Sequence, residues 1–150
     1  AEVLGVPPEG VETVQGDTDA VATGNGTGAC RSLTVGGAAV RLAALEVERR
    51  VRDLAAEALE AAPDDLQRDG ADWIVAGTDR RITWARLAAL ANGRLDADAN
   101  FAPRDYTYPA GVHAAEVEID PETGETALTR YLAIHDVGRA VSPAIVRGQL

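Results

Sequence analysis

The chain has 150 residues, of which 46% are hydrophobic and 25% charged, and it carries a formal charge of −10. This composition is typical of a globular domain, and no apolar run approaches the roughly 20 residues of a membrane-spanning helix, so we expect neither a disordered chain nor a membrane protein. The 14 basic residues are all arginines set among 24 acidic residues, which excludes the clustered positive field of a nucleic-acid surface.

The cysteine content and the ends of the chain set two further expectations. A single cysteine, Cys30, excludes an internal disulfide and favours a reducing compartment, so we expect a cytoplasmic protein. The chain contains no methionine and ends at Leu150 without a polar tail. We therefore expect residues 1–150 to be one partial domain, truncated at both ends.

The amino-terminal quarter of the chain is dominated by a glycine-rich stretch. Before it, Pro7 and Pro8 break a short helix end, and residues 11–14 are predicted to form a short strand. The stretch from Gly16 to Gly37 is too long for an ordinary connection within a domain. Because it leads directly into a strongly patterned helix, we expect it to be ordered and functional.

One long helix is predicted over residues 36–62. Apolar residues recur there at steps of three and four, and Pro63 closes the segment. The expected apolar stripe consists of Val40, Ala44, Val47, Val51, Leu54 and Ala58. This stripe predicts a helix with one face in the core.

A short strand and a second helix follow. Residues 73–76 are apolar and lie between glycines, which favours a strand. Thr83 is a good amino-terminal cap for a helix over residues 84–91, and Asn92 is a good stop. Residues 93–110 are expected to be irregular.

A β-hairpin is the clearest element of the last third. Residues 111–135 hold two alternating runs around the turn sequence of residues 120–124. Alternation is expected to place His113, Ala115, Val117 and Ile119 on one face of the first strand, and to separate Leu128, Leu132 and Ile134 from Thr129, Tyr131 and Ala133 in the second. The predicted fold class is therefore α/β (α+β): a mixed β-sheet with a β-hairpin, packed by one long helix.

The segment from Gly24 to Ser32 has the chemistry of an anion-binding loop. Its glycines allow a ligand to approach the backbone N–H groups, its hydroxyls are donors, and Arg31 adds a positive charge at a helix start. Pyrophosphate is the natural ligand. A flexible surface loop explains the composition equally well, and the segment matches neither a Walker loop nor a dinucleotide fingerprint.

Other reactive side chains have simpler explanations. Cys30 beside Arg31 has the surroundings of an activated thiol, but no base lies near it in sequence, so a small loop residue is the favoured interpretation. Asp17 and Asp19 favour a turn over a pair of catalytic acids.

The two histidines lie on different strands of the predicted hairpin. If Ile119 pairs with Thr126, then His113 and His135 are offset by three residues, about 10 Å along the strands. That separation is too large for shared metal ligation, and zinc needs further ligands. The sequence therefore predicts structural roles for both histidines and no metal site.

Three blocks of sequence, in order, resemble one known family. They are the segment Gly16–Val40, the segment Tyr108–Glu125 with its Asp-Pro-Glu-Thr-Gly turn, and the segment Asp136–Gln149 with its Asp-Val-Gly-Arg start. Together they resemble the large, molybdopterin-binding subunits of the xanthine dehydrogenase and aldehyde oxidase family, and most of all the aerobic carbon monoxide dehydrogenase-like large subunits of bacteria.

The resemblance implies a cofactor and a set of residues that contact it. The cofactor would be molybdopterin with molybdenum, in its cytosine dinucleotide form. The candidate contacts are Gly26, Thr27, Gly28, Ala29, Cys30, Arg31, Ser32, Asp136 and Gln149. No catalytic residue and no protein ligand to the metal is expected in this chain, because the general-base glutamate of the family lies further along the polypeptide.

The resemblance also implies an enzyme and partners. The parent protein would oxidise a small C–H substrate, such as an aldehyde or an N-heterocycle, or CO, with water as the oxygen source. Electrons would pass to an iron–sulfur subunit and an FAD-binding subunit of a hetero-oligomer. Two alternatives stay open: a nucleotide- or phosphate-binding module without redox chemistry, and an inactive fragment.

Overall fold

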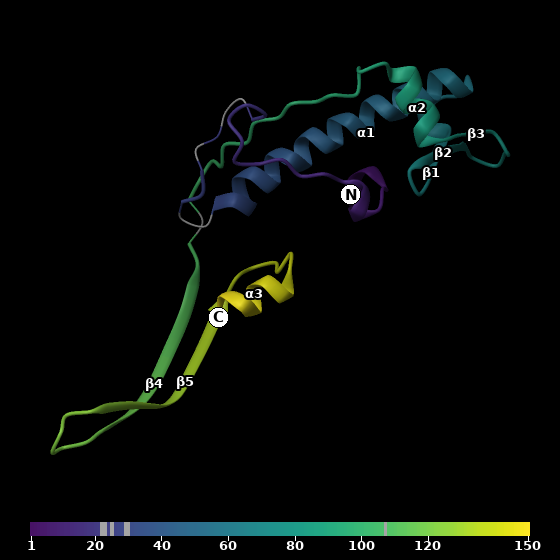
Figure 1. Ribbon diagram of the computed structural model, residues 1–150. Coiled ribbons are helices and arrows are strands. Elements are labelled where there is room, and N and C mark those ends of the chain that lie inside the picture. Colours follow the sequence, from purple (N-terminus) through teal and green to yellow (C-terminus); the bar gives the residue numbers. More distant parts are fainter. Residues whose placement is uncertain (22–23, 25, 29–30, 107) are drawn as a thin grey trace. The chain divides into compact units, whose positions relative to one another are not determined.

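A computed structural model covers residues 1–150, and it describes all of them except 22–23, 25, 29–30 and 107 (Figure 1). The described chain forms two units, Ala1–Pro103 and Arg104–Leu150. Helices and small antiparallel sheets make up both units, which confirms the predicted helix-plus-strand class. No helix in the described part is long and apolar enough to cross a bilayer.

The first unit is built around one long helix. Its elements are η1 (Glu2–Leu4), η2 (Pro8–Gly10), the π-helical turn η3 (Ser32–Gly37), α1 (Ala38–Leu59), η4 (Pro63–Asp65), β1 (Leu66–Asp69), β2 (Asp72–Val75), β3 (Arg81–Ile82) and α2 (Trp84–Ala91). The helix predicted over residues 36–62 is thus confirmed as α1. It ends earlier than expected because Glu60 adopts a left-handed conformation with φ 46°.

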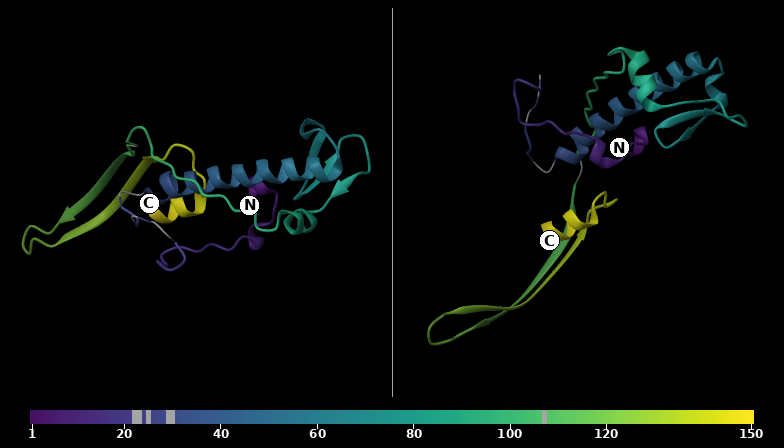
Figure 2. Two further views of the ribbon diagram at one scale, coloured as in Figure 1. Left: turned by 90° about the horizontal axis from the view of Figure 1, so that it is seen from above. Right: turned by 45° about the vertical axis from the view of Figure 1, so that its right-hand side comes forward.

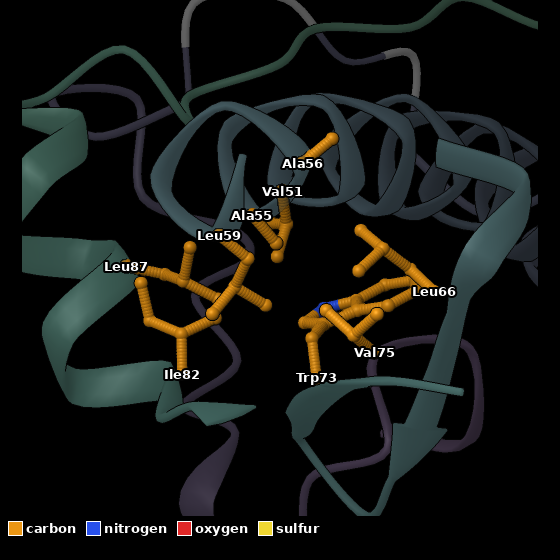
Figure 3. Packing of buried hydrophobic residues seen from close by; sticks show 9 residues of the cluster. All are labelled: Val51, Ala55, Ala56, Leu59, Leu66, Trp73, Val75, Ile82 and Leu87. Atoms are coloured by element: carbon orange, nitrogen blue, oxygen red, sulfur yellow. The ribbon is translucent and has the colours of Figure 1, made fainter. Parts of the chain in front are cut away.

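The buried face of α1 differs from the predicted stripe. Val51, Ala55 and Leu59, spaced by four residues, point into the core, whereas Ala58 is exposed and Val40 is 70% exposed. The prediction was wrong at these two positions because helical spacing alone does not say where the packing partners lie. The partners, β2, β3 and α2, meet the carboxyl-terminal half of α1 (Figure 3).

A three-stranded antiparallel sheet closes the core beneath α1. β2 confirms the predicted strand, and it pairs with β1 and β3 in the register Leu66↔Val75 and Trp73↔Ile82. These four side chains are buried together with Leu87 of α2. β1 and β3 were not predicted, since such short strands form only where β2 offers a partner.

Both ends of α2 follow the predicted capping chemistry. The Thr83 hydroxyl accepts a hydrogen bond from the Arg86 amide at 3.3 Å, and Asn92 ends the helix in a left-handed conformation with φ 47°. A second acceptor reinforces the start of the helix, because the Asp72 carboxylate accepts from the Trp84 amide at 2.9 Å. Cap residues therefore fix α2 against the sheet.

The strand predicted at residues 11–14 is absent from the structure, and this prediction was wrong. Residues 11–14 follow the 3₁₀ turn η2 without regular secondary structure. No strand in the described part of the chain pairs with them. Alternation of side chains alone does not make a strand where a hydrogen-bonding partner is lacking.

The second unit is a long hairpin followed by a short helix (Figure 2). β4 (Ala110–Ile119) pairs with β5 (Thr126–Asp136), and α3 spans Pro143–Gln149. The predicted pairing of Ile119 with Thr126 is confirmed. The hairpin is a separate two-stranded sheet, so the described strands form two antiparallel sheets in place of the single mixed sheet that was expected.

A β-bulge changes the faces of β5. Val117 pairs with Leu128 and Glu116 with Arg130, so one extra residue, Thr129, is accommodated between them. The Thr129 hydroxyl donates to the Glu116 carbonyl at 3.0 Å. As a result Leu128 shares a face with Tyr131 and Ala133, not with Leu132 and Ile134 as the alternation predicted.

Candidate functional site

The glycines of the glycine-rich loop have open space beside them in the described structure. Gly26 has φ 65°, a conformation that favours glycine. A Cβ atom placed on Gly24, Gly26 or Gly28 would meet nothing within 4 Å. The space beside these glycines is therefore free of other parts of the described chain, as an anion-binding loop requires.

Two hydroxyls and one guanidinium gather where the loop becomes a helix. The Thr27 and Ser32 hydroxyl oxygens lie 2.5 Å apart. Nε and Nη2 of Arg31 donate to the Gly26 carbonyl at 3.4 and 3.3 Å, and the Arg31 amide donates to the Gly28 carbonyl at 3.3 Å. The structure thus brings together five of the predicted contact residues. Ala29 and Cys30, also predicted contacts, lie outside the described residues.

The helical start itself is unusual. Residues Ser32–Gly37 form a π-helical turn ahead of α1, and its amino-terminal cap residue, Arg31, makes no side-chain cap hydrogen bond. The first N–H groups of a helix have no carbonyl partner within the helix, and the helix dipole favours an anion there. Because Arg31 is also the only basic side chain among the first 40 residues, positive charge in this region is concentrated at the loop.

The two remaining predicted contacts lie in the second unit. The Asp136 carboxylate ends β5 and accepts a hydrogen bond from the Gly138 amide at 2.9 Å, which forms the turn at the hairpin exit. Gln149 is the last residue of α3. Their participation in one site with the loop of the first unit stays a prediction.

Asp17 and Asp19 form the turn that the sequence favoured. The Asp17 carboxylate accepts a hydrogen bond from the Asp19 amide at 2.9 Å, immediately after Gly16 with φ 74°. A carboxylate that organises its own backbone in this way is typical of an Asx turn. The prediction of a turn is confirmed.

The histidines are closer together than the sequence predicted. The extra residue at the β5 bulge shifts the register, so His113 pairs with Ala133 and His135 with Gly111. The two imidazole ring centres are 4.7 Å apart with their planes at 88°. The predicted separation of about 10 Å was wrong because alternation in a sequence does not reveal a single inserted residue. In the described part of the chain, no group of three or more His, Cys, Asp or Glu side chains is arranged to hold a metal ion.

Comparison with known proteins gives a consistent result. The family model of the molybdopterin cofactor-binding domain matches residues 1–150. The chain is 36% identical, over 100% of its length, to the 6-hydroxypseudooxynicotine dehydrogenase complex subunit gamma of Paenarthrobacter nicotinovorans. It is also 36% identical, again over 100% of its length, to the carbon monoxide dehydrogenase large chain of Hydrogenophaga pseudoflava.

A solved structure agrees with these sequence matches. The crystal structure of the Cu,Mo-CO dehydrogenase in its carbon monoxide reduced state superposes with a TM-score of 0.79 and 30% identity, over 98% of this chain and 20% of that one. The chain spans 20% of the length of both sequence relatives as well. What those whole proteins do is therefore a property of much longer polypeptides.

Proposed function

Because this chain belongs to the family of molybdopterin cofactor-binding domains, we propose that it supplies part of the cofactor site in the large subunit of a molybdenum hydroxylase. It is homologous to the large subunits of carbon monoxide dehydrogenase and nicotine 6-hydroxylase. The reaction would be oxidation of a small substrate, either a C–H compound such as an aldehyde or an N-heterocycle, or CO. Water would supply the oxygen.

The observation that carries this proposal is the cluster of donors at the start of η3. The Thr27 and Ser32 hydroxyls lie against each other, and the Arg31 guanidinium lies over the loop beside Gly26. A phosphate accepts hydrogen bonds from hydroxyls, backbone amides and guanidinium together, so these residues fit a pterin dinucleotide. Two hydroxyls that now bond to each other can both turn their protons toward such a ligand.

The residues of this chain would bind and orient the cofactor. When bound, the molybdenum cofactor supplies the two-electron redox chemistry. Thr27, Arg31 and Ser32 would hold its phosphates, while Gly26 and Gly28 let it approach the backbone; Ala29, Cys30, Asp136 and Gln149 complete the proposed contact set. The general base would come from another part of the polypeptide.

Family membership is also the basis on which we propose the form of the cofactor, the partner subunits and the location of the protein. The cofactor would carry a cytosine dinucleotide, and electrons would leave through an iron–sulfur subunit and an FAD-binding subunit. Relatives described as a large chain and as a subunit of a complex support a hetero-oligomer. A cytoplasmic location agrees with a chain that has a single cysteine.

Arg31→Ala in the intact protein tests the loop. Removal of one charge-assisted contact should weaken cofactor affinity by about 10- to 150-fold, from roughly 1.5–3 kcal/mol. Molybdenum per chain should fall, while the iron and flavin of the partner subunits stay constant. Arg41→Ala is the matched control, because Arg41 is exposed on α1 and the same charge is lost.

Cys30→Ser separates binding from thiol chemistry. Serine is small and a better donor, so molybdenum occupancy and turnover should both be kept. Full occupancy in Arg31→Ala would contradict the phosphate-binding loop, and loss of turnover in Cys30→Ser with the cofactor still bound would require a chemical role for the thiol. Wild-type protein that contains phosphate ligand but neither molybdenum nor pterin would identify a non-redox module instead.

A further inference from the structure

The hairpin holds the only two histidines of the chain on one of its faces. His113 lies on β4 and His135 on β5, two positions apart in the ladder, since His113 is opposite Ala133. Their rings approach edge to face at 4.7 Å. Both side chains are exposed in the described structure. No role in the proposed cofactor site uses these rings.

The spacing of the two rings matches shared ligation of one metal ion. An imidazole nitrogen binds Zn²⁺ at about 2.0–2.1 Å, so two imidazoles on neighbouring positions of one ion place their ring centres about 4.5–5 Å apart. The observed 4.7 Å lies within that interval. The rings are now edge to face, so the spacing of the strands allows both to reach one ion once the side chains rotate to turn a nitrogen of each toward it.

Tyr131 fixes one of the two rings. Its phenol oxygen lies 2.5 Å from Nδ1 of His113, and the two rings are tilted at 54° with centres 5.6 Å apart. An imidazole that donates its Nδ1–H to this oxygen keeps its free lone pair on Nε2. Ligating histidines in metal sites are held by such a hydrogen bond from the other ring nitrogen.

Gly111 makes room for the other ring. A Cβ atom at position 111 would lie 3.2 Å from Nδ1 of His135 and 3.0 Å from the Ile134 carbonyl oxygen. A side chain at position 111 would therefore crowd the His135 ring. The ring can lie where it does because the residue opposite it is a glycine.

The charge around the hairpin favours a cation. Residues 104–150 carry seven carboxylates and four arginines. We propose that His113 and His135 form a two-imidazole site for one borderline divalent transition-metal ion, Cu²⁺ or Ni²⁺, with Tyr131 as the positioning residue. Imidazole prefers these ions over Mg²⁺ and Ca²⁺, which bind oxygen ligands, and the remaining positions on the ion would be taken by water.

Metal binding to the intact protein, stripped of loosely bound ions by dialysis against a chelator, tests the proposal. Calorimetric titration with Ni²⁺ and with Cu²⁺ should show one more bound ion per chain in the wild type than in the double variant His113→Gln, His135→Gln. Each single variant should bind that ion at least about tenfold more weakly. Equal stoichiometry in the wild type and the double variant would overturn the site.

Two positioning variants and one spectroscopic measurement keep the test independent of changes at the ligands. Tyr131→Phe and Gly111→Ala should each lower the affinity for the ion by about 10- to 100-fold, which is the usual effect of removing the group that holds a metal ligand in place. Molybdenum content should not change in any of these variants. Wild-type protein loaded with one equivalent of Cu²⁺ should show electron-spin-echo modulation from two imidazole nitrogens, and a signal from one or none would overturn the shared site.

Discussion

The Arg50 guanidinium donates to the main-chain carbonyl of Asp96, 46 residues along the chain, and so ties α1 to the segment that follows α2. The same group reaches the Arg94 carbonyl at 3.4 Å. On its other side Nε of Arg50 donates to the Glu46 carboxylate at 2.8 Å. Glu46 therefore holds Arg50 in the orientation that this tertiary contact needs.

This arrangement predicts a pH dependence. Hydrogen bonds from Arg49 and then Arg50 lower the pKa of Glu46 from 4.5 to about 2. A carboxylate with a lowered pKa stabilises the fold above its unfolded pKa, and this contribution is lost as the pH falls from about 4.5 to about 2. Protonation should free Arg50 and expose the amides near Asp96.

Hydrogen exchange of the intact protein between pH 6 and pH 2, corrected for intrinsic rates, measures this effect. Protection near residues 94–96 should fall with pH in the wild type and should be low at every pH in Glu46→Gln. Glu57→Gln is the control, because Glu57 lies on the same helix with no ion pair in the described structure. Identical profiles for the wild type and Glu46→Gln would exclude the role of this carboxylate.

The core of the first unit predicts a large effect at Leu87. Its side chain has 0% exposure and packs α2 against α1 and the three-stranded sheet. Leu87→Ala should lower the free energy of unfolding by about 2–5 kcal/mol, through lost burial and the cavity that remains. Leu45→Ala, at a position that is 38% exposed on α1, should change it by less than about 1 kcal/mol. Urea unfolding followed by tryptophan fluorescence reports both, and equal effects would contradict the assigned core.

The elements that the sequence predicts well are those fixed by local chemistry. Thr83 and Asn92 bound α2 because a cap and a stop act within one helical turn. The hairpin turn follows in the same way from Asp120, whose carboxylate accepts from the Glu122 and Thr123 amides at 2.8 and 3.2 Å. These hydrogen bonds also lower the pKa of Asp120.

The elements that the sequence predicts poorly depend on partners that are distant in sequence. The buried face of α1 is set by where β2, β3 and α2 pack, and the spacing of apolar residues along a helix carries no information about that. The bulge at Thr129 leaves no trace in the alternation of β5, yet it brings His135 two positions from His113 in place of three. Likewise, the glycines, hydroxyls and Arg31 of the loop are recognisable as a local motif, whereas a shared cofactor site with Asp136 stays a prediction, because it depends on tertiary structure.

The hairpin turn predicts a specific loss of stability at Gly124. This residue has φ 75°, and its amide donates to the Asp120 carbonyl at 2.8 Å. A β-branched side chain is strained at that angle, so Gly124→Val should cost about 1–3 kcal/mol in the intact protein. Gly124→Asn should cost less, because asparagine tolerates a left-handed conformation. The thermal unfolding midpoints of the two variants measure this difference. Equal midpoints for Gly124→Val and Gly124→Asn would contradict the turn geometry.

The second unit predicts that the two parts of the chain differ in their ability to fold alone. Every buried residue of the described chain lies between positions 51 and 91, and the hairpin has none among its described side chains. Val112 and Ile134, which face each other across the ladder, are 68% and 61% exposed. A two-stranded hairpin without a covered face is marginal in water.

Separate expression of residues 1–103 and 104–150 checks this difference. The first piece should unfold with a cooperative thermal transition by circular dichroism, and the second should show none. The 150-residue chain expressed alone should aggregate through its exposed apolar hairpin, and Val112→Thr with Ile134→Thr should reduce its binding of a hydrophobic dye. A cooperative transition in residues 104–150 would show that the hairpin carries its own stabilising core, contrary to the exposure of its side chains.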